Sequence, residues 1–207
     1  MWLWVIGVLL CGYLIGCLHG SVVATKISGV NLKETGVKNA GASNATIVLG
    51  KKFGALVAAI DIGKGALAVL LVHFFSVNAE LPGNDVALLL FLVGAATVAG
   101  HNFPFYMQFN GGKGTATVIG VLLALDWRFG LVGFALLVVV ALTTNFLVFG
   151  VLMLYVTFLT LAFWSEGYWP IVIAIVLFIL AIWKHIENFQ RMKEGSEKRV
   201  SAVFKKK

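Results

Sequence analysis

Residues 53–77 read FGALVAAIDIGKGALAVLLVHFFSV, an apolar run that contains only two charged residues, Asp61 and Lys64. About 20 mostly apolar residues are enough for a helix to cross the hydrocarbon core of a bilayer. Further apolar runs lie near 2–25, 86–103, 115–125, 129–144, 147–164 and 169–183. The sequence therefore predicts an all-α polytopic membrane protein with about seven transmembrane helices.

The composition supports this class. Of the 207 residues, 60% are apolar and 12% are charged, roughly half the charged share of a soluble protein. This balance excludes a soluble globule, a disordered chain and a nucleic-acid-binding domain. The run 115–125 is too short to cross roughly 30 Å of hydrocarbon upright, so five or six spans are the alternatives. We expect 1–207 to form a single integral membrane domain, with 192–207 as a basic tail.

The basic residues predict the orientation. All but two of the 16 Lys and Arg residues, Lys64 and Arg128, fall on one side of the predicted membrane, mainly in the first inter-helix segment and at the C-terminal end. Lysine and arginine concentrate in cytoplasmic loops. The sequence therefore predicts the N-terminus outside and the C-terminus in the cytoplasm, and the formal net charge of +7 then follows largely from topology.

The first polar segment, residues 35–46, reads TGVKNAGASNAT and lies between two apolar runs. Glycine lets the backbone approach a ligand, and asparagine offers both donors and acceptors. The segment is either a plain linker or a binding loop. As a binding loop, it offers these candidate substrate-binding residues: Lys38, Asn39, Gly41, Ser43 and Asn44.

The second segment, residues 109–117, reads FNGGKGTAT and precedes an apolar run. Backbone N–H groups of a glycine-rich turn, next to a helix N-terminus and a lysine, form an anion cradle. The spacing is shorter than in a Walker-type loop, so no nucleotide is implied. The alternative is a flexible hinge. The candidate phosphate-binding residues are Gly111, Gly112, Lys113, Gly114 and Thr117.

The third segment, residues 184–191, reads KHIENFQR. If it is helical, His185, Asn188 and Arg191 follow one another along one side. This side could hold a phosphate at the membrane surface through charge-assisted hydrogen bonds. The alternative is a basic tail attracted to anionic lipid.

Charged and imidazole groups inside the apolar runs are the remaining candidates. Asp61 and Lys64 can pair at an i, i+3 spacing, and we expect them to support the first polar segment rather than to react. His19 and His73 stand alone in apolar runs and are expected to be structural. The spacing of cysteine, histidine and acidic residues indicates no metal or other cofactor.

The three segments, in this order, resemble the PlsY family of bacterial membrane acyltransferases. The resemblance rests on these residues: Gly36, Asn39, Gly41-Ala42-Ser43-Asn44, Leu49-Gly50-Lys51-Lys52, Asp61, Lys64-Gly65, Gly100-His101, Phe103-Pro104, Gly111-Gly112-Lys113-Gly114, Ala116-Thr117, His185, Asn188, Arg191, Gly195 and Glu197.

This resemblance implies seven helices in the bacterial cytoplasmic membrane, with the motifs at the cytoplasmic face. It implies transfer of a fatty acyl group from acyl-phosphate to glycerol-3-phosphate, giving lysophosphatidic acid, without a thioester donor or a cofactor. It also suggests His101, Lys113, His185 and Asn188 as catalytic residues, with His101 and His185 as polarising groups.

Several family positions are changed. A serine is replaced by Val37 and an arginine by Ile47, while basic residues are replaced by Asn110 and Ile186. The loop near residue 145, usually a basic-aromatic-x-Ser pattern, reads Asn145-Phe146-Leu147-Val148. Lys38 could restore part of the lost charge. The changes predict a pocket poorer in cations than in the family. They leave two alternatives, an acyltransferase with a changed acceptor or donor, and a lipid-phosphate binding or transport protein without the reaction.

Overall fold

The computed structural model describes residues 1–203, and every regular element in that range is a helix, which confirms the all-α prediction. The elements are α1 (Trp2–Gly16), α2 (Gly20–Ser28), α3 (Ala42–Leu49), α4 (Lys51–Asn78), α5 (Gly83–Asn102), η1 (Phe105–Met107), α6 (Thr115–Leu125), α7 (Trp127–Thr144), α8 (Leu147–Trp164), α9 (Trp169–Lys184), α10 (Ile186–Lys193) and η2 (Val200–Val203). The last residues of the predicted tail, 204–207, lie outside the described range.

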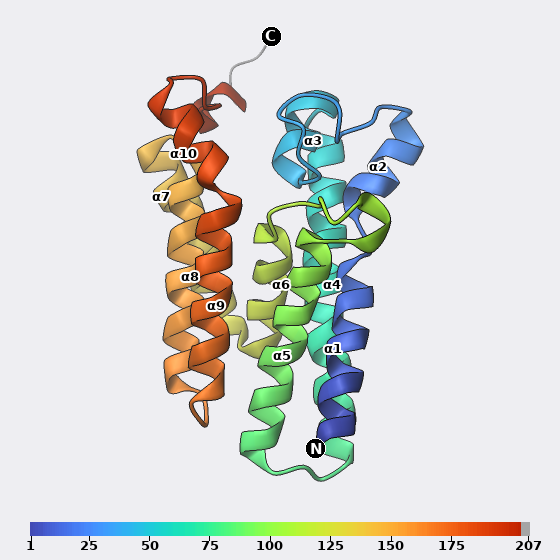
Figure 1. Ribbon diagram of the computed structural model, residues 1–207. Helices are drawn as coiled ribbons and strands as arrows, with labels where there is room; N and C mark the ends of the chain where they lie inside the picture. Colours follow the sequence, from blue (N-terminus) through green and yellow to red (C-terminus); the bar gives the residue numbers. More distant parts are fainter. Residues whose placement is uncertain (204–207) are drawn as a thin grey trace.

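The long helices form one bundle, with the N-terminus at one end and the last described residues, 200–203, at the other (Figure 1). Helices α1, α4, α5 and α6 pack together, and α7, α8 and α9 form a second group beside them. The short helices α2, α3 and α10 all lie at the end of the bundle opposite the N-terminus. The three polar segments are therefore gathered at one end of the molecule.

Six helical stretches are long and apolar enough to cross a membrane, and α6 is a shorter apolar helix of 11 residues. At 1.5 Å per residue α6 covers only about 16 Å, roughly half of the hydrocarbon thickness. Its turn into α7 lies short of the end that carries the N-terminus (Figure 1). The prediction of about seven helices thus corresponds to six full-length stretches and one short helix at 115–125.

The first predicted run, residues 2–25, is broken between α1 and α2. The break frees backbone carbonyls inside the apolar region, where unpaired polar groups are costly. Lys64 supplies the partner, because its Nζ donates to the carbonyls of Gly16 (2.9 Å) and Leu18 (2.7 Å). A lysine on α4 therefore makes the break in the first span possible.

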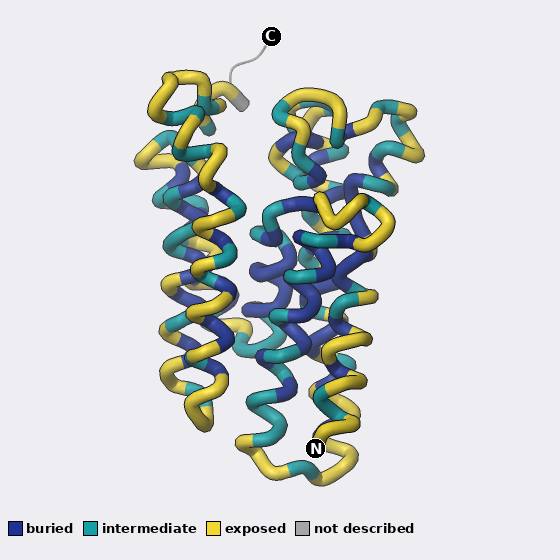
Figure 2. Tube along the Cα trace, viewed as in Figure 1, coloured by how far each residue is buried: buried dark blue, intermediate teal, exposed yellow. Residues whose placement is uncertain are grey.

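Burial is densest where α4, α5 and α6 meet, whereas the outer faces of the bundle are exposed (Figure 2). Those exposed positions include many large apolar side chains, among them Leu70, Phe74, Leu131, Val139 and Ile179. An apolar outer surface of this kind suits contact with lipid.

Helices α4 and α6 approach so closely that one glycine position has no room for a side chain. A Cβ at Gly65 would lie 2.3 Å from the carbonyl oxygen of Thr117. At Gly63, on the same helix, a Cβ would meet no heavy atom within 4 Å. The pair offers a matched test of this contact.

We expect Gly65→Ala to destabilise the protein by about 1–3 kcal/mol, because the two backbones must separate. Gly63→Ala should be neutral or stabilising by up to about 1 kcal/mol, since alanine has the higher helix propensity. Thermal unfolding of the purified proteins in one detergent compares them. Equal melting temperatures for the two variants would contradict the close approach.

Candidate functional site

A pocket of about 680 Å³ lies at the end of the bundle where the polar segments meet. Its walls come from the loop before α3, the loop before α6, and the junction of α9 with α10. The lining residues are Lys33, Val37, Lys38, Asn39, Asn110, Gly111, Lys113, Trp183, Lys184, Ile186, Glu187 and Arg191. Five of these side chains are cationic and one is a carboxylate, so the pocket suits an anionic ligand.

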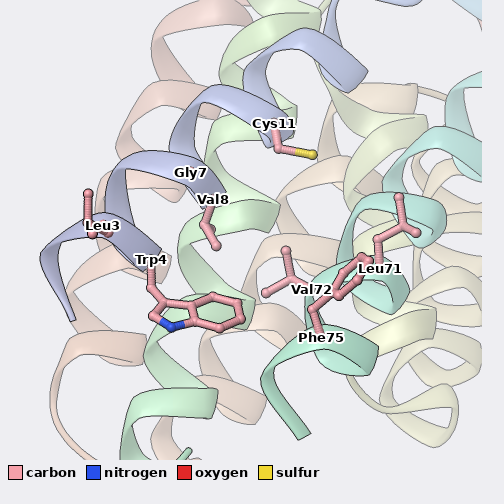
Figure 3. Close-up of a pocket in the computed structure, with 8 residues that line it drawn as sticks. All are labelled: Leu3, Trp4, Gly7, Val8, Cys11, Leu71, Val72 and Phe75. Carbon is pink, nitrogen blue, oxygen red and sulfur yellow. The ribbon is translucent and has the colours of Figure 1, made fainter. Parts of the chain in front are cut away.

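A second hollow, of about 420 Å³, lies between α1 and α4 (Figure 3). Its lining residues are Leu3, Trp4, Gly7, Val8, Cys11, Leu71, Val72 and Phe75. None of them is charged, so this hollow offers nothing to balance the charge of a phosphate.

Asn44 organises the first polar segment. Its side chain is fully buried, accepts a hydrogen bond from the Val37 N–H (2.9 Å), and donates through Nδ2 to the carbonyls of Leu32, Thr35 and Asn39 at 2.8–3.0 Å. These bonds engage both Nδ2 and Oδ1 of the buried side chain, and Asn44 does not line the pocket, which differs from the expectation that it binds substrate. It instead folds the loop so that Lys38 and Asn39 line the pocket.

The glycine loop is built differently from the cradle that the sequence predicts. The N–H groups of Gly111 and Gly112 donate to the carbonyls of Asn102 (3.0 Å) and His101 (3.1 Å). They are therefore not free to bind an anion, and the loop is fastened to the end of α5. Gly114, with φ +81°, is the N-cap residue of α6. The charge in this loop comes from the Lys113 side chain.

Lys113 begins a chain of polar contacts that leads to Arg191, another residue of the pocket lining. Its Nζ donates to Asn188 Oδ1 on α10. Asn188 Nδ2 donates to Glu197 Oε1 (2.6 Å), and Arg191 Nε donates to Glu197 Oε2 (2.7 Å). The predicted residues Lys113, Asn188 and Arg191 are thus brought together, and Glu197 joins two of them.

His101 lies behind the glycine loop in a buried polar cluster. Its Nδ1 lies 2.8 Å from Lys64 Nζ and 3.6 Å from Asp61 Oδ1, and Asp61 pairs with Lys64 at 3.0 Å. The predicted ion pair is present, but it supports the α1–α2 break and His101 rather than the first polar segment. His19, expected to stand alone, stacks on His101 with 4.5 Å between ring centroids.

His19, Asp61 and His101 have the atom types of a metal site, with candidate ligand atoms within 4.8 Å of one another. The Lys64 ammonium already lies within hydrogen-bond distance of Asp61 and His101. A metal ion at this position would be repelled by that charge, so the residues present favour lysine over a metal.

The remaining predicted residues lie at the edge of the site or behind it. His185 is buried, and its Nδ1 lies 2.8 Å from the carbonyl oxygen of Ala181 in its own helix. Thr117 is buried in the first turn of α6, Ser43 is exposed in the first turn of α3, and Gly41 is the N-cap residue of α3. None of these four lines the pocket.

The changed family positions predict a pocket poorer in cations than in the family, and that comparison stays a prediction, while the pocket of this chain contains five cationic side chains. Ile47, which stands where the family has an arginine, is exposed on α3 and does not line the pocket. Its apolar side chain therefore forms no part of the pocket wall. Lys33 and Lys184 add charge that the motif comparison missed. Lys33 Nζ also donates to Asn110 Oδ1 (2.9 Å), which joins the first polar segment to the glycine loop. In the sequence, Lys33 and Lys184 indicate only the orientation of the chain in the membrane.

The environment of the pocket lowers the pKa of Lys113 and of Lys33. Burial lowers the pKa of Lys113 to about 8, and the nearby Arg191 charge acts in the same direction. Burial also lowers the pKa of Lys33, while Glu187 opposes that shift. A lysine with a pKa near 8 keeps most of its charge at neutral pH and loses it in mildly alkaline solution.

The fold and the site together define a polytopic helical membrane protein with a cationic pocket at one end of its bundle. Residues 6–195 match the family model described as glycerol-3-phosphate acyltransferase. The chain belongs to this glycerol-3-phosphate acyltransferase family.

Individual relatives agree with this assignment. The chain is 43% identical over 198 residues to glycerol-3-phosphate acyltransferase 1 of Oceanobacillus iheyensis, covering 96% of each chain. It is 33% identical to glycerol-3-phosphate acyltransferase 2 of Thermotoga maritima, covering 94% of this chain and 95% of that one. A crystal structure of PlsY, an integral membrane glycerol 3-phosphate acyltransferase, in its glycerol 3-phosphate form superposes with a TM-score of 0.84 at 31% identity. That match covers 97% of this chain and 99% of the other.

Proposed function

We propose that this protein transfers a fatty acyl group from acyl-phosphate to glycerol-3-phosphate and produces lysophosphatidic acid. Family membership supports the reaction type, and a similar solved structure is described as the lysophosphatidic acid form of PlsY. The observation that carries the proposal is the pocket itself, where Lys33, Lys38, Lys113, Lys184 and Arg191 face a common space. Two phosphorylated substrates need such a concentration of positive charge.

In the proposed reaction a hydroxyl oxygen of glycerol-3-phosphate attacks the acyl carbonyl carbon, and the carbon–oxygen bond to the donor phosphate breaks. The hydroxyl proton passes to the departing phosphate, so no protein base is required. The cations hold both phosphates and offset the negative charge that develops on the leaving group. Positioning of the hydroxyl beside the carbonyl supplies the remainder of the rate enhancement.

We assign supporting roles to the two predicted catalytic histidines. A Cβ at Gly112 would lie 2.1 Å from His101 Nε2, so the His101 ring is packed directly behind the glycine loop. His185 is bonded within its own helix end and lies beside Lys184 and Asn188 in sequence. Neither histidine lines the pocket. His101 supports the glycine loop, and His185 supports the junction of α9 with α10, and both of these segments contribute lining residues.

The basic residues predict that the pocket faces the cytoplasm of a bacterial cell. The structure is compatible with this orientation, because the lysine-rich segment between α2 and α4, the loop that carries Lys113 and the described part of the tail lie at the same end as the pocket (Figure 1). Reaction of single cysteines at position 38 or position 198 with an impermeant thiol reagent, in cells and in inverted vesicles, tests the assignment.

The lowered pKa of Lys113 predicts a pH dependence. Lys113 is charged below pH 8 and neutral above it, whereas the substrate phosphate is already doubly charged at about pH 7. We therefore expect kcat/KM for glycerol-3-phosphate to fall above about pH 8 by up to about tenfold per pH unit. Lys113→Arg should move this decline to higher pH, because arginine stays charged. If kcat/KM of the Lys113→Arg variant declined over the same pH range as in the wild type, a group other than Lys113 would be responsible for the decline.

The proposed function is tested by incubating the purified protein in lipid nanodiscs with palmitoyl-phosphate and labelled glycerol-3-phosphate. We expect labelled lysophosphatidic acid, and none from palmitoyl-CoA. Absence of product with the acyl-phosphate donor, in protein that is folded by thermal unfolding, would overturn the proposal.

A changed acceptor or donor is the second candidate, because Val37 and Ile186 place apolar groups in the pocket wall where the family has polar ones. The same assay with a panel of phosphorylated acceptors distinguishes the two functions. A higher kcat/KM for an acceptor other than glycerol-3-phosphate would favour this candidate.

A further inference from the structure

Helix α10 carries Asn188 and Arg191 to the site, yet little apolar packing holds it there. None of its residues is buried. Phe189 makes one edge-to-face ring contact with Phe149, at 6.4 Å between centroids. The position of α10 therefore depends on polar contacts, which Lys113 makes from the glycine loop and Glu197 makes from the chain that follows α10.

That following chain turns back over α10. Gly195 has φ +73°, and the N–H groups of Ser196 (2.8 Å) and Glu197 (3.1 Å) donate to the carbonyl of Arg191. The turn brings the Glu197 carboxylate to Asn188 and Arg191. Only two residues then separate Glu197 from Val200, so the place where Val200 is anchored restricts where Glu197 can lie.

The anchor is Asn145, the residue that ends α7. Its carbonyl accepts from the Val200 N–H (3.0 Å), its side-chain Oδ1 accepts from the Ser201 N–H (2.8 Å), and its Nδ2 donates to Ser201 Oγ (3.0 Å). Arg199 adds a cation–π contact with Phe146, at 5.4 Å from the ring centroid. We call the three hydrogen bonds of Asn145 with residues 200 and 201 the C-terminal latch.

Asn145 also suits the backbone of this turn. Its φ is +63°, in the left-handed region that asparagine adopts more readily than most residues. Asn145 is not among the residues that line the pocket, so its contacts with residues 200 and 201, rather than a contact with phosphate, define its role here. In the sequence, Asn145 falls in the loop where the family usually has a basic residue.

We propose that Asn145 is a positioning residue for the reaction. Through the C-terminal latch it keeps Glu197 against Asn188 and Arg191, and so keeps α10 in place beside Lys113. The inference rests on the proposed function, because it assigns Asn145 a part in binding the phosphorylated acceptor.

The decisive variant is Asn145→Gly, which allows the same backbone conformation but removes two of the three latch hydrogen bonds. We expect KM for glycerol-3-phosphate to rise about 5- to 30-fold, with kcat changed less than about twofold. Ser201→Ala, which loses one bond, should give a smaller rise. Thr143→Ala is the matched control, since that hydroxyl bonds only to carbonyls of its own helix, and its kinetics should match the wild type.

Hydrogen exchange of the full-length protein separates positioning from general stability. In Asn145→Gly, exchange should accelerate across 186–202 and stay unchanged in α4 and α5. An unchanged KM, or unchanged exchange in 186–193, would overturn the inference. If the wild-type protein forms no lysophosphatidic acid, the proposed function fails. The exchange rates then still decide whether Asn145 holds α10, and unchanged rates reject the latch.

Discussion

Lys113→Ala is expected to reduce kcat/KM for lysophosphatidic acid formation by about 100-fold or more, because one charged donor at a developing anion contributes about 10²- to 10³-fold. Lys113 lines the pocket and donates to Asn188. Its removal takes one ammonium from the phosphates and also leaves the Asn188 acceptor without its partner. Initial rates over a range of glycerol-3-phosphate concentrations measure the loss.

Two variants show whether the charge of Lys113 is responsible. Lys113→Arg keeps the charge and should recover part of the activity, limited by the different shape of the guanidinium. Lys193→Ala removes an exposed cation from the last turn of the neighbouring α10, outside the pocket lining, and should change the rate less than about twofold. Equal losses in Lys113→Ala and Lys193→Ala would mean that only net surface charge matters.

Asp61→Asn should be the most destabilising polar substitution in the bundle. Asp61 and Lys64 are at most 4% exposed and lie 3.0 Å apart. Removal of one partner of a buried pair leaves an uncompensated charge and costs about 3–5 kcal/mol. For a chain of this length, such a loss lowers the melting temperature by roughly 10 °C, which thermal unfolding in detergent detects directly.

The double variant Asp61→Leu with Lys64→Met supplies the control. Replacement of both charges by apolar groups avoids the unpaired charge, so stability should recover in part. Full recovery is not expected, because the carbonyls of Gly16 and Leu18 lose their donor. A double variant less stable than Asp61→Asn would show that Lys64 stabilises the fold chiefly through those carbonyls.

The three polar segments show how far the site can be predicted from sequence. Glycine spacing, charge and helical periodicity predict Lys113, Asn188 and Arg191 as site residues. In the structure Lys113 bonds to Asn188, and Glu197 joins Asn188 to Arg191. Asn44 and the N–H groups of Gly111 and Gly112 were assigned to the ligand, but internal hydrogen bonds occupy them. The sequence shows which residues carry hydrogen-bond donors and acceptors. Whether these groups bond to a ligand or to the protein itself depends on how the loop folds.

The sequence by itself determined the membrane class, the apolar stretches and the grouping of polar segments, because hydropathy and charge act locally along the chain. The short run 115–125 was visible in the same way and corresponds to α6. The break between α1 and α2 could not be placed from hydropathy, because it depends on Lys64 of α4, which satisfies the carbonyls at the break.

Only the tertiary structure decided which cations share the pocket. Lys33 and Lys184 are separated by more than half the chain, and no local pattern relates either of them to Lys113. Packing of α9 beside α5 brings these segments to one space. Other helix contacts bring Asn145 to Ser201 and His19 to His101, because contacts between distant residues arise from helix packing rather than from sequence spacing.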